Sequence, residues 1–328
     1  DWSSDVCSSD LDEALRLLAV DTRYTAQLAR VGNLDRRRRA DAISGSPIEG
    51  VGAHYAHAAG LSGAGQTIAI SDTGFLTTHE VFAGTSVTVS GAPPIDDHGT
   101  FVASVAAGNS ANMVGVAPGA ALILGNYSGT ASLTSVVVLA RQSGAVALNN
   151  SWNFAGLEAN RADYRILFAP ADGAAYLAAL KSYNASGGVV VWAAPNDFSA
   201  SGVGLMAALP VLEPDLAAGW LAVVNGLPTL SGDDVVAARR LSAGCLEAAA
   251  WCLAADGTWI GAGAGGVAAY DIGTGTSYAA PAVSGTLALL GEAFPDLTPQ
   301  QLRVRLLASS DNNFAGFTKS GKIGRAHV

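Results

Sequence analysis

The chain has 328 residues, enough for one large domain with a sizeable buried core. Half of the residues are apolar, only 14% are charged and 39 are glycine, a composition typical of a compact, loop-rich globular protein. The 18 basic and 27 acidic side chains give a formal charge of −9 with no basic patch among aromatic residues, which argues against nucleic acid as a partner.

The two ends of the chain, residues 1–11 and 322–328, resemble translated sequencing-library adapter. Codons can be chosen for residues 5–10 whose reverse complement encodes residues 323–328, as one oligonucleotide read from both ends of a fragment would give. We exclude both ends from fold reasoning. We therefore expect the true termini to be missing and the place of a signal peptide to be overwritten.

Residues 12–50 are interpreted as an N-terminal extension or the remnant of a propeptide, followed by a domain over residues 51–321 that is truncated at its C-terminal end. Four arginines at positions 36–39 fit a processing site after a propeptide. They also fit a solvated helix face or linker, which is the commoner role of such a run.

Five apolar runs predict strands covered on both faces, at residues 66–72, 121–126, 145–151, 188–194 and 220–225. Helical patterns alternate with these runs, at residues 98–107, 133–143, 174–183, 277–294 and 299–308. Thr298, Pro299 and Gln301 give the last helix a capping box. The alternation predicts an α/β fold with a mainly parallel central sheet and helices on both faces.

Three short motifs carry reactive side chains: Asp-Thr-Gly at residues 72–74, His-Gly-Thr at 98–100 and Gly-Thr-Ser-Tyr-Ala-Ala-Pro at 275–281. A hydroxyl needs an imidazole to take its proton and a buried carboxylate to orient that imidazole. Each motif alone is a weak signal, because Asp-Thr-Gly often ends a strand and Gly-Thr-Ser often caps a helix. Together they predict a serine nucleophile system.

The strand and helix pattern places these groups on one rim of the sheet. Asp72 and Asn196 follow strands, and catalytic groups gather at the carboxyl ends of parallel strands. His98 and Ser277 open helices, where free amides and the dipole favour developing negative charge.

From about residue 63 to about 310, the chain resembles the subtilisin-like serine peptidases (subtilases), whose triad has the same Asp, His, Ser order. The resemblance implies a subtilisin-like fold and a serine endopeptidase that hydrolyses peptide bonds through an acyl-enzyme. Ser277 is the expected nucleophile, His98 the general base and then acid, and Asp72 the orienting carboxylate. Within the family, residues 148–152 and a cysteine pair are most similar to the peptidase passenger domain of bacterial autotransporters.

The resemblance also implies an oxyanion donor. Residues 189–196 match the strand and asparagine that supply it, so Asn196 is expected to act with the Ser277 amide. An asparagine that serves a turn is the alternative. Pro195 departs from the glycine usual before this residue, and because proline fixes φ and lacks an N–H, we expect a reshaped loop and leave the strength of the oxyanion hole in question.

Residues 145–154 resemble the strand whose edge pairs with an extended substrate, so Ser151, Trp152 and Asn153 are expected to bind substrate. Asn153 and Phe154 stand where the family commonly has glycines, which narrows the pocket for the residue before the cut. A purely structural Trp152 is the alternative to a pocket wall.

Cys245 and Cys252 leave six residues between them, a loop that either closes as a disulfide or holds two buried free thiols. An even cysteine count, with Cys7 of the excluded end set aside, suits an exported protein. No cysteine and histidine cluster predicts a zinc or other metal site, no organic cofactor is required, and calcium cannot be assigned from scattered acidic residues.

The expected partners are polypeptide substrates, with neither nucleic acid nor a membrane span in this fragment. The autotransporter likeness implies secretion or display at the cell surface of a Gram-negative bacterium, and leaves room for a missing C-terminal membrane barrel. The alternative is a catalytically impaired binding or adhesin domain on the same fold, motivated by Pro195, Asn153 and Phe154. An aspartic peptidase ranks third, because its second Asp-Thr-Gly is absent.

Overall fold

The computed structural model describes residues 13–18, 46–231 and 234–310. The arginine run at 36–39, both adapter-like ends and most of the expected N-terminal extension lie outside these residues. The domain bounds stay predictions. Ile48, at the end of the expected extension, is fully buried in the same core as the central sheet.

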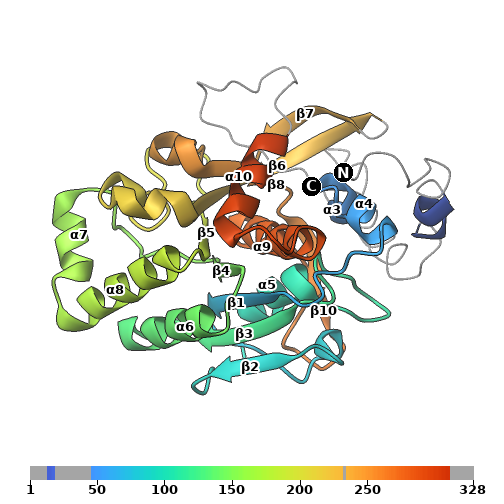
Figure 1. Cartoon of the computed structure of the whole chain (residues 1–328), viewed down its shortest axis with the longest axis horizontal. Coiled ribbons are helices and arrows are strands. Elements are labelled where there is room, and N and C mark those ends of the chain that lie inside the picture. Colours follow the sequence, from blue (N-terminus) through green and yellow to red (C-terminus); the bar gives the residue numbers. More distant parts are fainter. Residues whose placement is uncertain (1–12, 19–45, 232–233, 311–328) are drawn as a thin grey trace.

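The chain forms an eight-stranded sheet, a two-stranded sheet and surrounding helices (Figure 1). The strands are β1 (Thr67–Asp72), β2 (Val87–Ser90), β3 (Ala121–Asn126), β4 (Ala147–Asn150), β5 (Val189–Ala193), β6 (Trp220–Ser231), β7 (Asp234–Arg240), β8 (Cys252–Ala255), β9 (Thr258–Ala262) and β10 (Tyr270–Thr274). From residue 46 on, the α-helices are α3 (Pro47–Gly50), α4 (Ala53–Ala58), α5 (Asp97–Ala107), α6 (Thr130–Gln142), α7 (Arg161–Phe168), α8 (Ala171–Ala185), α9 (Thr276–Ala293) and α10 (Pro299–Ser309), and residues 13–18 are also helical.

The strand order of the large sheet is β2-β3-β1-β4-β5-β6-β7, with β8 also paired to β6. All of these pairs are parallel except β6 with β7. The α/β fold with a mainly parallel sheet is therefore confirmed, and the five strands expected from apolar runs are β1, β3, β4, β5 and the first half of β6.

Each central strand is buried on both faces because helices cover both. Ile68 and Ile70 point into one core, with α5, α9 and α10, whereas Ala69 between them joins the other, with α6 and α8. Figure 1 shows α9 and α10 apart from α6 and α8, with the sheet between them. Met113 and Met206, the two methionines of the chain, lie one in each core with at most 1% of either exposed.

Helix α10 begins as its sequence predicts. The Gln301 N–H donates to the Thr298 hydroxyl and the Gln301 side chain accepts from the Thr298 N–H, which completes a capping box with Pro299 in the first turn. No described helix combines the length and apolar character needed to cross a lipid bilayer.

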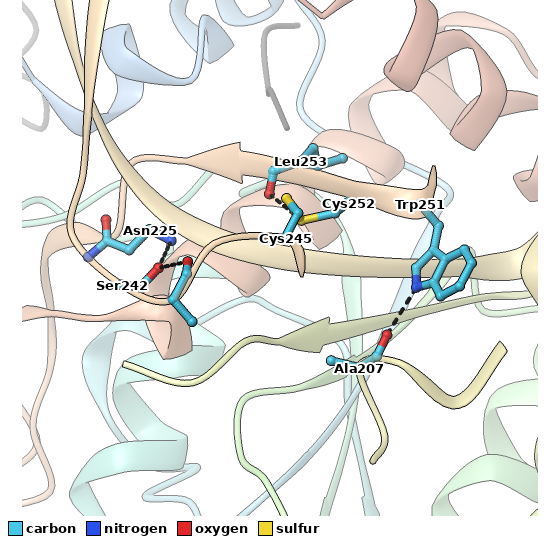
Figure 2. The surroundings of a disulfide bond; sticks show 8 residues. Ala207, Asn225, Ser242, Cys245, Trp251, Cys252 and Leu253 are labelled. Carbon is cyan, nitrogen blue, oxygen red and sulfur yellow. Dashed lines mark hydrogen bonds between the residues drawn. A yellow bond between two sulfur atoms is a disulfide. The ribbon is translucent and has the colours of Figure 1, made fainter. Parts of the chain in front are cut away.

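A disulfide joins Cys245 and Cys252, with 5.8 Å between their Cα atoms, which confirms the first of the two expectations for this pair (Figure 2). Both cysteines are buried, and the Trp251 indole donates a hydrogen bond of 3.0 Å to the Ala207 carbonyl. By the chain-entropy account, a loop this short adds about 2 to 3 kcal/mol to the free energy of unfolding.

Asp256 is a buried carboxyl group between β8 and β9, only 5% exposed. Burial raises its pKa to about 7, and the hydrogen bond from the Thr258 N–H offsets only part of that effect. In the unfolded chain an aspartate ionises near pH 4. Between about pH 4 and pH 7 the Asp256 carboxyl is therefore protonated in the folded protein and ionised in the unfolded chain. The free energy of unfolding falls as pH rises through this range.

We expect Asp256→Asn to remove this loss. The variant's free energy of unfolding should exceed that of the parent by up to about 4 kcal/mol above pH 8, measured by urea titration with both proteins carrying Ser277→Ala, which removes the expected nucleophile. Asp296→Asn, which removes an exposed carboxylate, is the control and should follow the parent. Equal pH dependence in Asp256→Asn and its parent would contradict the assignment.

Candidate active site

Asp72 and His98 meet at the carboxyl end of the sheet. Asp72 is the last residue of β1 and is fully buried, whereas His98 is the second residue of α5 and its side chain is 33% exposed. His98 Nδ1 lies 2.6 Å from Asp72 Oδ1. Because a carboxylate can only accept, Nδ1 carries the proton and Nε2 of the neutral ring is left as the basic nitrogen.

The surroundings of His98 make it a stronger base than a free histidine. Burial lowers its pKa, but the hydrogen bond to Asp72 and the negative charges of Asp72 and Asp96 outweigh burial, so the pKa is raised above its usual value of 6.5. A partly exposed imidazole with a raised pKa and a buried carboxylate partner is suited to proton transfer.

Asp96 and Thr73 hold the His98–Asp72 pair in place, a role that the sequence analysis did not predict for either residue. Asp96 caps α5, accepting from the His98 N–H at 2.9 Å, and its carboxylate also accepts from the Thr73 hydroxyl. The Thr73 oxygen in turn accepts from the Gly99 N–H at 3.2 Å. An aspartate directly before a predicted helix is a capping signal, and it could have identified Asp96.

Gly99 is required by close packing. A Cβ at this position would lie 2.2 Å from the Gly74 carbonyl oxygen and 3.1 Å from the Asp72 Cβ. The absence of a side chain therefore lets α5 approach the end of β1 closely enough for His98 to reach Asp72.

Ser277 is the second residue of α9 and exchanges two hydrogen bonds with Ser151, the residue after β4. The Ser277 hydroxyl donates to the Ser151 carbonyl at 3.1 Å, and the Ser151 hydroxyl donates to the Ser277 carbonyl at 2.8 Å. Proline has no N–H, so Pro281 cannot donate to the Ser277 carbonyl four residues earlier. Ser151 supplies that missing donor and fixes the start of α9 against β4.

His98 lies near the first turn of α9, which contains Ser277. The His98 ring centroid is 5.9 Å from that of Tyr278, the next residue, whose ring also packs at 4.0 Å on Phe101. Within the described part of the chain, the Ser277 hydroxyl bonds to Ser151 and not to His98. Hydrogen bonds between a nucleophile and its base are often long or poorly aligned without substrate, so this orientation of the Ser277 hydroxyl is compatible with a Ser277–His98 pair.

Asn196 lies beside the first turn of α9, three residues after β5. Its Oδ1 accepts from the Thr276 N–H at 2.9 Å, and the Thr276 hydroxyl donates to the Ala194 carbonyl at 2.6 Å. With Oδ1 fixed, the exposed end of the side chain is the Nδ2 donor. Pro195 does not draw the loop away, because its carbonyl accepts from the Ala243 N–H at 3.0 Å while Asn196 still reaches Thr276.

The Ser277 N–H is the second donor near this point. No hydrogen bond between described residues uses it, as expected for the first turn of a helix. A side-chain amide N–H and a free helix N-terminal amide are groups of the kind that can stabilise a developing oxyanion.

We expect Asn196→Ala to lower kcat by about 10²–10³-fold with a much smaller change in KM, because this donor acts chiefly on the transition state. Steady-state kinetics on a chromogenic peptide measure the split. Asn112→Ala, which removes an amide bonded to Glu80, is the control and should change neither constant by more than a few fold. A loss confined to KM would assign Asn196 to substrate binding instead.

The expected substrate-binding residues differ in their contacts. The Trp152 indole donates to the Ser71 carbonyl at 3.0 Å and packs on Trp192 and Tyr127 at 5.0 and 4.7 Å between ring centroids. These contacts favour the structural interpretation of Trp152. The Asn153 side chain hydrogen-bonds strand β5, while Ser151 lies directly against Ser277.

No group of three or more histidine, cysteine, aspartate or glutamate side chains is placed to hold a metal ion among the residues that the structure describes. That no cofactor is required stays a prediction.

The profile of the subtilase family matches residues 63–324 of this chain. An "Extracellular serine protease" of Serratia marcescens is 26% identical in an alignment 374 residues long, and the match covers 91% of this chain and 34% of that protein. The chain thus spans about a third of the length of this relative.

Solved structures share the fold. The self-cleaved protease domain of PatA matches with a TM-score of 0.62 and 25% identity, covering 81% of this chain and 95% of that one. Sphericase matches with a TM-score of 0.61 and 22% identity, covering 82% and 93%.

Proposed function

Because this chain belongs to the subtilase family, we propose that it is a serine endopeptidase in which Ser277, His98 and Asp72 form the catalytic triad. The observation that carries the proposal is the 2.6 Å hydrogen bond between His98 and the fully buried Asp72, beside the helix that begins with Thr276 and Ser277. Polypeptides are the proposed substrates.

The reaction has two halves. Ser277 Oγ attacks the peptide carbonyl as its proton passes to His98 Nε2, and the imidazolium then protonates the leaving amine. In the second half, His98 Nε2 takes a proton from water, and the hydroxide attacks the carbonyl of the acyl-enzyme. The imidazolium then gives this proton to Ser277 Oγ as the bond to the acyl group breaks. Asp72 keeps Nδ1 protonated and stabilises the imidazolium, while Asn196 Nδ2 and the Ser277 N–H stabilise the oxyanion.

We infer that the enzyme works outside the reducing cytoplasm. The Cys245–Cys252 disulfide supports export, since such bonds persist in oxidising compartments. The Serratia relative is named as extracellular, which supports the same placement. Display on a Gram-negative cell surface stays a prediction.

A fluorophosphonate probe tests the proposal directly. Such probes phosphonylate activated serines, so the wild-type protein should be labelled at Ser277, as located by peptide mass spectrometry, and Ser277→Ala should not be labelled. Equal labelling of the two proteins, or none in the folded wild type, would rule the mechanism out.

A further inference from the structure

Two segments flank the proposed nucleophile. One follows β4, and its Ser151 carbonyl accepts from the Ser277 hydroxyl. The other follows β5, and its Asn196 side chain accepts from the Thr276 N–H. A carbonyl attacked by Ser277 and stabilised by Asn196 must lie between them. On the proposed function, the substrate side chain on the acyl side of the scissile bond enters the space between the two segments.

The side chain of Asn153 crosses from one segment to the other. Its Nδ2 donates to the Ala193 carbonyl at 3.0 Å, and its Oδ1 accepts from the Trp192 indole N–H at 3.2 Å. Trp192 itself is fully buried, whereas Asn153 is exposed. The amide is therefore held at both ends by β5 and presents its outer surface to anything that enters between the segments.

The loop that contains Gly204 packs against the Asn153 side chain and restricts its movement. Gly204 has a φ of +78°, and a Cβ there would lie 3.3 Å from Asn153 Oδ1. The next residue is fixed, since the Leu205 N–H donates to the Leu157 carbonyl at 2.9 Å. Moving Asn153 would also leave the buried Trp192 N–H without an acceptor, which is costly.

We propose that Asn153 is a specificity-determining residue that limits the side chain before the scissile bond to small residues such as alanine. This inference rests on the proposed function. A large substrate side chain would clash with the Asn153 amide, which is held by two hydrogen bonds, whereas the methyl group of alanine would not reach it. One methylene of mismatch in such a site typically changes kcat/KM by about 10- to 200-fold.

The experiment compares kcat/KM for peptides that differ only in the residue before the cut, alanine, valine or phenylalanine. Fluorophosphonate titration gives the concentration of active enzyme for each protein. The wild type is expected to favour alanine over phenylalanine by at least about 100-fold. Asn153→Gly should reduce this ratio at least tenfold, and Asn153→Ala, which keeps a Cβ, should fall between.

Asn160→Gly is the matched control. It removes another exposed amide from the same connection, where Asn160 caps α7, and a glycine cap costs that helix little. Its alanine to phenylalanine ratio should equal that of the wild type.

The outcomes distinguish a failure of the size limit from a failure of the proposed peptidase function. If the wild type titrates fully but cleaves the phenylalanine peptide as well as the alanine peptide, the size limit is wrong and the peptidase assignment stands. An unchanged ratio in fully titrating Asn153→Gly and Asn153→Ala assigns selectivity to other residues and overturns the proposal. If the folded wild type does not titrate at all, the proposed function fails as well.

Discussion

Replacing His98 by alanine is expected to lower kcat for peptide hydrolysis by about 10⁶-fold. The variant keeps Ser277 at the start of α9 and the donors near Asn196, but no group remains to take the hydroxyl proton or to protonate the leaving amine. Residual activity should be that of binding and oxyanion stabilisation alone, about 10³–10⁴-fold above the rate in water.

Turnover of casein and of a chromogenic peptide measures this loss. The control is His57→Ala, which removes an imidazole that hydrogen-bonds the Val116 carbonyl. It should keep kcat within a few fold of the wild type. His98→Ala with more than a tenth of wild-type kcat would exclude His98 as the base. A folded wild type without turnover would favour the alternative, a binding or adhesin domain on this scaffold.

Replacing Asp72 by asparagine is expected to lower kcat by about 10⁴-fold while leaving the size of the side chain unchanged. The carboxylate now fixes the proton on His98 Nδ1 through the 2.6 Å contact to Oδ1. An amide in its place can donate to that nitrogen, which shifts the ring proton to Nε2 and removes the basic atom that the proposed mechanism requires.

The pH profile gives Asp72→Asn a second signature. Hydrolysis requires a neutral His98, so activity falls as pH drops through the pKa of that ring, which is raised above 6.5 in the wild type. Without the hydrogen bond and charge of Asp72, this acid limb should move to lower pH. Asp96→Asn keeps an oxygen that can cap the His98 N–H and removes only charge, so it should shift the limb less and cost under tenfold in kcat. A kcat for Asp72→Asn within tenfold of the wild type would contradict the orienting role.

The sequence predicts the central strands of the large sheet, which are set by burial, but not the short buried strands β8 and β9. Runs such as residues 121–125 are apolar because helices cover both faces of β3, and the observed strand, Ala121–Asn126, has the bounds expected from the sequence. Strand β6 was expected over 220–225 but continues to Ser231, because residues 226–231 pair with β7. Its last four residues alternate between partly buried and exposed and so lack the apolar run that predicted the first part. Strand β10 was missed because it is short and mostly exposed, with a glycine at position 273.

In the candidate site, the sequence predicted the positions that follow from topology but not the side-chain contacts. Asp72 and His98 meet because one ends a strand and the other opens a helix at the same rim, a relation that follows from topology. The exchange of hydrogen bonds between Ser151 and Ser277 depends on side-chain direction across two elements, which no sequence pattern encodes. The bridge from Asn153 to β5 escaped prediction for the same reason.

The two methionines have a chemical consequence for the proposed enzyme. Peroxides convert accessible thioethers to sulfoxides, but Met113 and Met206 are enclosed in the two cores, and the residue after Ser277 is a tyrosine. Among the described residues, peroxide should therefore find no accessible thioether beside Ser277, and it should form methionine sulfoxide only after the interior of the protein has opened.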